Sequence, residues 1–295
     1  MTRVSKIRKA VILAAGLGTR MLPASKAVPK EMLPAVDKPL IQYVVEEVAA
    51  AGIEEIIFVI APGKEAIREH FGTATRADAH ARQNGDPALI ERVSGPASLA
   101  TFRYVYQDAP RGQAHAVACA REYLEGEPFV LIFPDDLIFA QRSCVAQLVD
   151  AYDRTGGSII AVMEVPPAEV SQYGVVAPCG PGNPMPISGL VEKPAAGQAP
   201  SSLAIVGRYV LSETFFNFID RIQPGPGGEF WILDGFALQI AAGEPVSAFR
   251  YEGTRFDTGR PLGYMLAGIA AALRRPDLEG PLRQELSAML EREGH

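Results

Sequence analysis

Cysteine is scarce in this sequence, and its spacing excludes the sites that cysteine usually builds. The 295 residues contain three cysteines, Cys119, Cys144 and Cys179, and no Cys-x-x-Cys pair. Zinc sites and disulfide frameworks need cysteines at characteristic spacings. We therefore expect three reduced thiols and no zinc site.

Histidine is also scarce, which limits nucleophilic catalysis. The chain has four histidines, and one of them, His115, stands four residues before Cys119 in an expected helix. A nucleophilic triad needs a third group that orients the histidine, and none is evident. We do not expect triad chemistry.

Excess positive charge is absent. The chain has 28 Lys and Arg residues against 34 Asp and Glu residues, a net charge of −6 and a pI near 5.4. Proteins that bind nucleic acid rely on clustered basic residues that neutralise phosphates. The composition argues against a nucleic-acid partner and leaves room for a small anionic ligand in a local basic pocket.

A long apolar run is absent from the N-terminal region. Basic residues at positions 3, 6, 8 and 9 precede an apolar run that extends only from Ala10 to Ala15. A signal peptide needs an apolar region of about 7–15 residues, and a membrane helix needs about 20. We expect a cytoplasmic protein with no membrane partner.

The sequence does contain a glycine turn followed by cations. The apolar run Ala10 to Ala14 predicts a strand, which breaks at Gly16 and Gly18 and leads to Arg20. Lys26 and Lys30 follow shortly after. Glycine lets backbone N–H groups approach phosphate oxygens, and Arg and Lys supply charge. A plain turn is the alternative, but the cations favour a phosphate site.

Two common phosphate-binding classes do not fit this turn. It lacks the Gly-Lys-Ser/Thr ending of the P-loop, and it has Gly-x-Gly-Thr-Arg where a dinucleotide-binding fold has Gly-x-Gly-x-x-Gly.

Three consecutive segments resemble one bacterial enzyme family. The segments 13–23 (LAAGLGTRMLP), 25–34 (SKAVPKEMLP) and 37–43 (DKPLIQY) are similar to those of UTP:glucose-1-phosphate uridylyltransferases, also called UDP-glucose pyrophosphorylases. Related thymidylyltransferases usually have Ala-Gly-Gly in place of Ala14-Ala15-Gly16 and Lys-Gln-Leu in place of Lys30-Glu31-Met32, so the resemblance favours uridylyl transfer.

The resemblance implies an activity and its partners. The expected reaction joins UTP and glucose-1-phosphate, with Mg²⁺ as cofactor, and gives UDP-glucose and pyrophosphate. Relatives commonly form homodimers or homotetramers. The alternatives are a thymidylyltransferase, an enzyme for another sugar phosphate, or a catalytically silent nucleotide-sugar sensor.

The order of expected elements predicts an α/β fold. Apolar runs at 55–60, 102–107, 129–133, 158–165 and 203–211 predict strands, and helical patterns at 37–51, 64–71, 113–123 and 142–154 alternate with them. The resemblance specifies a Rossmann-like three-layer α/β/α nucleotide-diphospho-sugar transferase fold with a mixed, mainly parallel sheet. Residues 72–100 read as a surface excursion, helical in part, that is usually longer in the family.

We expect residues 1–295 to form a single nucleotidyltransferase domain. Residues 1–157 make the nucleotide-binding half, and residues 158–260, with shorter strands and turns, make the sugar-binding half. Residues 261–295 make a C-terminal helical tail, in which a helix at 281–293 carries apolar residues on one face. The tail is better suited to an interface or a lid than to chemistry.

Nucleotide recognition is expected at the ends of strands. Gln107 ends a predicted strand, and its amide can donate to a uracil carbonyl and accept from the ring N3–H; a solvent-facing Gln is the alternative. The resemblance assigns base recognition to Gln107 and Gly112. The full set that it implies for the nucleotide is Ala15, Gly16, Gly18, Thr19, Lys26, Glu31, Gln107, Gly112 and Asp136.

Two adjacent carboxylates follow the strand at 129–133. Asp135 and Asp136 lie on opposite sides of the backbone if the strand continues, so only one should face the ligand; a turn or helix cap is the alternative. Magnesium is usually held by one or two carboxylates plus substrate phosphates. The resemblance places the metal on Asp135 and Asp257, with Asp136 beside the ribose or structural.

The sugar side rests on a second motif. Glu192-Lys193-Pro194 resembles the family's Val-Glu-Lys-Pro, in which Glu holds sugar hydroxyls and Lys holds the sugar phosphate; a solvated surface pair is the alternative. Gly174 resembles the glycine that approaches the hexose. Trp231 replaces a Gln of the family pattern and could wall the hexose site or pack as core. The catalytic cations implied are Arg20, Lys30 and Lys193.

Overall fold

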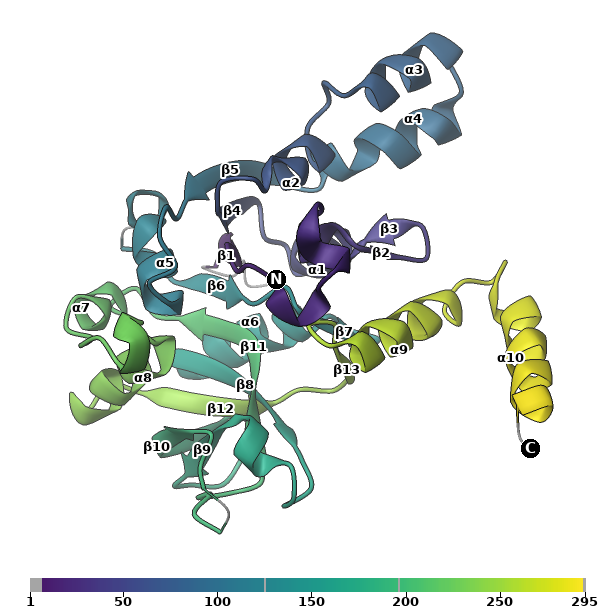
Figure 1. Cartoon of the computed structure of the whole chain (residues 1–295). Helices are drawn as coiled ribbons and strands as arrows, with labels where there is room; N and C mark the ends of the chain where they lie inside the picture. The colour runs from purple at the N-terminus through teal and green to yellow at the C-terminus, as the bar shows by residue number, and fades with distance from the viewer. Residues whose placement is uncertain (1–6, 125, 196, 294–295) are drawn as a thin grey trace.

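The computed structural model describes residues 7–124, 126–195 and 197–293, and these residues fold around one nine-stranded sheet (Figure 1). From edge to edge its strands are β5 (Thr101–Tyr106), β4 (Glu55–Ile60), β1 (Lys9–Ala14), β6 (Phe129–Ile132), β11 (Leu203–Leu211), β8 (Ser158–Glu164), β12 (Val246–Arg250), β10 (Met185–Glu192) and β9 (Gly174–Pro178). Strands β11 and β10 run against the other seven. The predicted mixed, mainly parallel sheet is confirmed.

Alternation along the central strands builds two cores. In β1, Val11 packs in the core on one face of the sheet, while Ile12 packs in the core on the other. Neighbouring β4 does the same with Ile57 and Phe58. A strand that is apolar at every position is buried on both faces, so helices must cover both.

Helices form the outer two layers. Helices α1 (Leu40–Ala49) and α6 (Cys144–Thr155) pack on the Ile12 face, and α5 (Gln113–Cys119), α7 (Phe216–Ile219) and α8 (Ile232–Ala241) pack on the Val11 face. The three-layer α/β/α prediction is confirmed. The helix expected at 113–123 ends earlier, and a 3₁₀ turn, η5 (Arg121–Tyr123), completes that segment.

Two small antiparallel ladders lie outside the main sheet, and the first of them joins segments that are distant in the sequence. Strand β7 (Asp136–Phe139) pairs with β13 (Thr254–Asp257), which sets Asp136 opposite Asp257. Strand β2 (Pro34–Ala35) pairs with β3 (Lys38–Pro39). The first ladder therefore carries a carboxylate from late in the chain to the turn after β6.

The excursion at 72–100 is a helical hairpin that projects from the body beyond α2 (Glu65–His70) (Figure 1). Helix α3 (Arg76–Asn84) begins with a capping box between Thr75 and Asp78, and Gly85, at φ 75°, turns the chain. Helix α4 (Pro87–Ser94) follows, then a 3₁₀ turn, η4 (Gly95–Ser98). The predicted break and partial helicity are confirmed.

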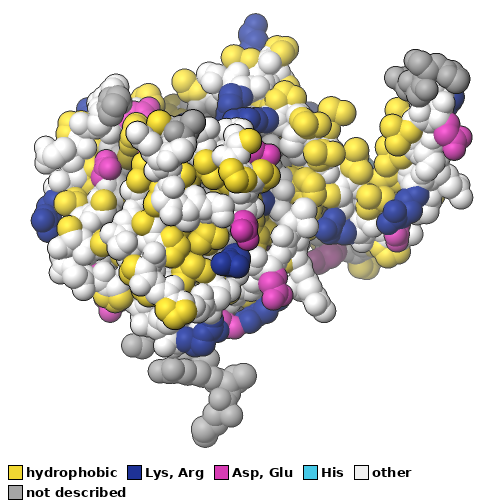
Figure 2. Space-filling model, turned by 90° about the horizontal axis from the view of Figure 1, so that it is seen from below, with side chains coloured by type: hydrophobic (Ala, Val, Ile, Leu, Met, Phe, Trp, Pro, Cys, Tyr) yellow, Lys and Arg dark blue, Asp and Glu magenta, His cyan; other side chains and the backbone are white. Residues whose placement is uncertain are grey.

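The C-terminal tail extends away from the sheet. Helix α9 (Pro261–Ala272) leads to α10 (Glu279–Glu293), which stands apart from the body (Figures 1 and 2). Their exposed apolar side chains are Leu262, Met265, Leu266, Met289 and Leu290. Within the described part of the chain, no helix is long and apolar enough to cross a membrane.

Candidate active site

The candidate site is a pair of adjoining cavities beyond the carboxyl ends of the central strands. One cavity, of about 290 Å³, is lined by seven of the predicted residues: Arg20, Asp135, Asp136, Gly174, Glu192, Lys193 and Asp257. The other, of about 280 Å³, is lined by Ala15, Gly16, Lys30, Glu31, Gln107, Gly112 and again Asp135. Gln113 and Phe133 also line both cavities. Predicted residues from both halves of the chain thus meet around Asp135. Gly18, Thr19 and Lys26 belong to neither lining.

The glycine turn is stabilised by hydrogen bonds from residues that follow it closely in the sequence. Gly18, at φ 68°, caps a 3₁₀ turn, η1 (Thr19–Met21), and its carbonyl accepts hydrogen bonds from Ser25 Oγ at 2.8 Å and Met21 N at 3.0 Å. Two further 3₁₀ turns follow, η2 (Ala24–Lys26) and η3 (Lys30–Met32). A Cβ at Gly18 would lie 3.2 Å from the Lys30 side chain. Gly18 is therefore required by conformation and by its closeness to Lys30.

Gly16 has a different requirement. Its φ lies outside the left-handed region, and a Cβ there would meet no protein atom within 4 Å. The space beside Gly16 opens on the second cavity.

If the glycine turn receives the phosphates of UTP, as the sequence resemblance implies, Gly16→Ala is expected to leave thermal unfolding unchanged and to weaken UTP binding by about tenfold. The added methyl group occupies the space through which a phosphate would approach, and overpacking costs about 1–3 kcal/mol. Differential scanning fluorimetry and calorimetric titration with UTP measure the two quantities. Unaltered UTP affinity would show that no phosphate approaches Gly16.

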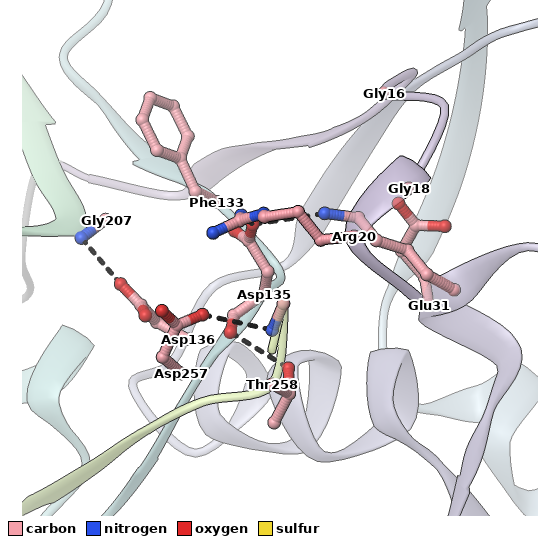
Figure 3. Close-up of polar contacts among 12 residues, drawn as sticks. Gly16, Gly18, Arg20, Glu31, Phe133, Asp135, Asp136, Gly207, Asp257 and Thr258 are labelled. Atoms are coloured by element: carbon pink, nitrogen blue, oxygen red, sulfur yellow. Dashed lines mark hydrogen bonds and ion pairs between the residues drawn. The ribbon is translucent and has the colours of Figure 1, made fainter. Parts of the chain in front are cut away.

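Asp135 is the central carboxylate of the site (Figure 3). Its Oδ2 lies 3.1 Å from Lys30 Nζ and 3.5 Å from Arg20 Nη2. Its backbone oxygen accepts hydrogen bonds from Thr258 N at 2.8 Å and Thr258 Oγ1 at 2.9 Å. Burial alone would raise the pKa of Asp135, but Lys30 and Arg20 outweigh burial and hold the pKa below its ordinary value. Asp135 is therefore ionised and rigidly placed.

Asp257 shares the same space. A methyl group at Gly259 would lie 3.1 Å from Asp257 Oδ1, 3.2 Å from Asp135 Oδ2 and 2.8 Å from Arg20 Nη2. Two carboxylates from distant segments therefore converge on one small region. No cluster of three metal-binding side chains occurs among the described residues. Two carboxylates suit Mg²⁺, which takes its remaining ligands from phosphates and water.

Asp136 points away from Asp135, as the alternation of a strand predicts. Its Oδ2 accepts a hydrogen bond from Gly207 N at 3.1 Å (Figure 3). Its Oδ1 accepts one from Arg255 Nε at 2.7 Å. Burial raises the pKa of Asp136, and the ion pair with Arg255 acts in the opposite direction. The side chain thus anchors β13 and β11 beside the first cavity.

Two buried cations support the site, and sequence reasoning missed both. Arg208, with no exposed surface, pairs with Glu47 at 2.8 Å and donates to the carbonyl oxygens of Phe133 at 3.0 Å and Asp136 at 2.7 Å. It therefore clamps the turn that carries Asp135. A charged residue within an otherwise apolar predicted strand was the available signal.

The second buried cation is Lys64, which follows strand β4. Its Nζ lies 2.9 Å from both carboxylate oxygens of Glu31 and 2.6 Å from the carbonyl oxygen of Gly16. Glu31, predicted to bind nucleotide, is 2% exposed and is engaged by Lys64.

Gln107 lies in the second cavity with its amide nitrogen engaged. Gln107 Nε2 donates to Gly112 O at 3.1 Å and lies 3.0 Å from His115 Nδ1. A Cβ at Gly112, whose φ is 91°, would come within 2.5 Å of Phe230 O, so only glycine fits. Cys119 Sγ lies 3.9 Å from His115 Nδ1. His115 therefore lies between Gln107 and Cys119 in helix α5, and no third group makes it part of a nucleophilic triad among the described residues.

The residues predicted to bind the sugar lie on β9 and at the end of β10, where Gly174, Glu192 and Lys193 line the first cavity. Lys193 has φ 44°, which is uncommon for a residue with a side chain and often marks a functional position. Its side chain is 64% exposed and its Nζ lies 3.6 Å from Glu192 Oε1. A Cβ at Gly174 would come within 2.9 Å of Glu192 Oε2. Trp231 is half-buried, outside both linings, and its Nε1 donates to Glu229 Oε2 at 3.3 Å.

The comparisons with known proteins agree along almost the whole chain. The model of the nucleotidyl transferase family matches residues 9–271. A UTP–glucose-1-phosphate uridylyltransferase of Bacillus subtilis (strain 168) is 40% identical over 291 residues, which cover 98% of this chain and 99% of that protein.

Solved structures agree as well. A UDP-glucose pyrophosphorylase complexed with UDP-glucose is 36% identical, with a TM-score of 0.82, and the match covers 91% of this chain and 100% of that one. A UTP-bound UGPase from Acinetobacter baumannii is 34% identical, with a TM-score of 0.87, and covers 95% of this chain and 98% of its own.

Proposed function

Because the chain belongs to the nucleotidyl transferase family, and within it to the UTP–glucose-1-phosphate uridylyltransferases, we propose that the cleft around Asp135 transfers a uridylyl group from UTP to glucose-1-phosphate. The phosphate oxygen of the sugar forms a bond to the α-phosphorus of UTP, and the bond to pyrophosphate breaks. UDP-glucose and pyrophosphate are the products. The observation that carries this proposal is the convergence of Arg20, Asp135 and Lys193 on one cavity.

The obstacle to this reaction is electrostatic. Glucose-1-phosphate is already an anionic nucleophile, so no general base is required. Two unit negative charges about 4 Å apart repel by about 4 kcal/mol at an effective dielectric constant near 20, and a sugar phosphate meeting a triphosphate contains several such pairs. Fixed cations must therefore surround the reacting phosphates.

Different cations would serve the departing pyrophosphate and the incoming sugar phosphate. Arg20 and Lys30 flank Asp135 and would hold the departing pyrophosphate. Lys193, at the far wall of the first cavity and largely exposed, has the reach to neutralise the incoming sugar phosphate. Ala15 and Gly16, which line the second cavity, would offer backbone groups to the triphosphate, and the neighbouring Gly18, Thr19 and Lys26 would extend the phosphate site beyond the two cavities.

The base and the sugar are recognised on opposite sides of Asp135. Gln107 and Gly112 would contact the uracil, because both line the second cavity. Glu192 would accept hydrogen bonds from hexose hydroxyls, and Gly174 lets the ring approach the backbone. Asp136, whose carboxylate is fixed by Arg255 and Gly207, would lie beside the ribose.

Asp135 and Asp257 would hold Mg²⁺, whose role when bound is to neutralise charge on the α-phosphate. The two carboxylates fit this role because they are close together and Asp135 is ionised. In the free protein, Lys30 and Arg20 form ion pairs with Asp135. With the nucleotide and Mg²⁺ bound, Asp135 would face the metal, and the two cations would pair with the phosphates instead.

The deciding experiment is pyrophosphate release on mixing the protein with UTP, Mg²⁺ and glucose-1-phosphate. The proposal expects release that requires all three, and expects TTP and other sugar phosphates to support slower turnover. A protein that binds UTP without releasing pyrophosphate would be a silent sensor instead, and faster turnover with TTP would indicate a thymidylyltransferase.

Lys193→Ala is expected to raise the KM for glucose-1-phosphate by about tenfold or more and to change the KM for UTP by less than about threefold. A charge-assisted hydrogen bond contributes about 1.5–3 kcal/mol, and Lys193 lies on the sugar side of Asp135. Steady-state kinetics with each substrate varied in turn give both values. An equal rise for the two substrates would reject the assignment of Lys193 to the sugar phosphate.

The division of the single domain follows from the same cleft. We propose that residues 1–157 serve the nucleotide and residues 158–260 serve the sugar, because the second cavity is lined mainly by the first set and the first cavity by both. The tail at 261–295 is assigned to assembly.

The assembly is proposed as a homodimer or homotetramer, formed through α9 and α10. Their exposed apolar side chains, such as Met265 and Leu290, make this arm poorly suited to remain in water. Light scattering gives the mass that tests it. A cytoplasmic location is also proposed, since Cys119, Cys144 and Cys179 are free thiols; cell fractionation checks it.

A further inference from the structure

Lys64 lies directly beneath the glycine turn without facing the ligand space. It precedes α2, is 7% exposed, and lies outside the linings of both cavities. Its ammonium group donates to Glu31 in η3 and to the carbonyl oxygen of Gly16, the latter at 2.6 Å. Lys64 therefore ties two segments of the phosphate site together from inside the protein.

The bond to Gly16 fixes the direction of one peptide group. In a planar trans peptide, the carbonyl of one residue and the N–H of the next point in opposite directions. Because the Gly16 carbonyl is turned inward to Lys64, the N–H of Leu17 is turned outward. The Leu17 side chain is 75% exposed, and Gly16 lines the second cavity. Leu17 itself lies outside both linings, so the outward face of this peptide is open to solvent beside the second cavity.

We propose that Lys64 is a positioning residue, which presents the Leu17 N–H to the phosphates of the nucleotide by holding the Gly16 carbonyl in the interior. The inference rests on the proposed function, in which the glycine turn receives UTP. It assigns to Lys64 an effect on nucleotide affinity without any contact to the nucleotide.

Glu31 explains why a lysine is tolerated here. A buried ammonium group without a partner would be strongly destabilising. Glu31 meets it with both carboxylate oxygens, so the pair adds no net charge to the site. Arg20 and Lys30, which line the two cavities, are free of this pair and can face the nucleotide phosphates. The Lys64–Glu31 pair therefore shapes the glycine turn, while other cations bind the phosphates.

The test compares variants that remove the hydrogen bond from Lys64 to the Gly16 carbonyl with a variant that only lowers the stability of the fold. Lys64→Met alone leaves Glu31 buried and unpaired, so the main variant is the double substitution Lys64→Met/Glu31→Leu, which replaces the pair by apolar side chains. Its dissociation constant for UTP, measured by calorimetry, is expected to rise by about tenfold, the effect of losing one or two good hydrogen bonds. The KM for glucose-1-phosphate should change by less than about threefold.

Two controls separate positioning from stability and from direct binding. Ile67→Ala loosens α2, where Ile67 is fully buried, and should lower the melting temperature while leaving UTP affinity unchanged. Glu31→Gln keeps the Lys64 amine next to Gly16 and should weaken UTP binding less than the double substitution does.

Three results would overturn the inference. The first is a normal UTP affinity in the double variant, and the second is an equal loss of UTP affinity in Glu31→Gln and the double variant. The third is a loss of UTP affinity in Ile67→Ala in proportion to its lowered melting temperature. The failure of the proposed function looks different, because the unmodified protein would then neither bind UTP nor release pyrophosphate.

Discussion

Asp135→Asn is expected to lower turnover of UTP and glucose-1-phosphate by about a hundredfold or more while the protein stays folded. The substitution keeps the shape of the side chain and removes the charge that would hold Mg²⁺ against the α-phosphate. Metal stabilisation of developing charge contributes several kcal/mol, and each 1.36 kcal/mol corresponds to a factor of ten in rate. Pyrophosphate release under saturating substrates measures the loss.

The fold should tolerate this change because Asp135 is partly exposed and its ion pairs are shared between Lys30 and Arg20. The pair with Arg20, whose side chain is 54% exposed, contributes little, and the asparagine amide still offers an oxygen acceptor to the largely buried Lys30. Urea unfolding should confirm this small difference. Asp220→Asn is the matched control, since Asp220 forms a surface ion pair with Arg121 far from the cleft; it should retain full activity. Near-normal turnover of Asp135→Asn would remove the metal assignment.

Arg208→Met is expected to have the largest effect on stability, lowering the free energy of unfolding by about 3–5 kcal/mol. Arg208 is fully buried, and its loss leaves Glu47 as an uncompensated buried charge. It also removes the donors to the carbonyl oxygens of Phe133 and Asp136. Denaturant unfolding followed by circular dichroism gives the value. Arg103→Met, at a surface ion pair with Glu55, is the control and should leave the free energy of unfolding nearly unchanged.

The double substitution Arg208→Met/Glu47→Leu distinguishes the two roles of Arg208. Replacing a buried ion pair by apolar side chains is often neutral, so the part of the loss due to Glu47 should return. The carbonyl oxygens that flank Asp135 would still lack their donor, so activity should remain low. Full recovery of both stability and activity would mean that Arg208 serves Glu47 alone.

The elements that the sequence predicted well are those set by local pattern. Strand β4 has the predicted bounds of 55–60, and β11 has the predicted bounds of 203–211. Strand β4 is apolar after Glu55, and β11 is apolar apart from Gly207 and Arg208. Such apolar runs are buried wherever they fall in the sheet. Helix ends were less accurate, as at 113–123, because the final turn depends on tertiary contacts.

The meeting of the glycine turn with the carboxylate was also predictable, because both belong to motifs that follow strands. Gly16 and Arg20 follow a strand directly, and Asp135 follows another. Parallel strands bring their carboxyl ends to one edge, so these residues had to meet. The direction of Asp136, away from Asp135, followed from the alternation of a strand.

The supporting pairs were not predictable. Lys64 meets Glu31 across 33 positions in the chain, and Arg208 meets Glu47 across 161. No local pattern signals either pairing, since each depends on which strands become neighbours. For the same reason the sequence could not show that Glu31 would face Lys64 inside the protein.

The sequence by itself determined the layers, the cation-rich glycine turn and the carboxylates, because hydrophobic period and motif chemistry are properties of short segments. Only the tertiary structure decided which carbonyl groups point inward and which cations lie beneath the site instead of in it. That choice depends on burial, which makes an unpaired charge so costly that each interior lysine or arginine must find its partner wherever the fold places one.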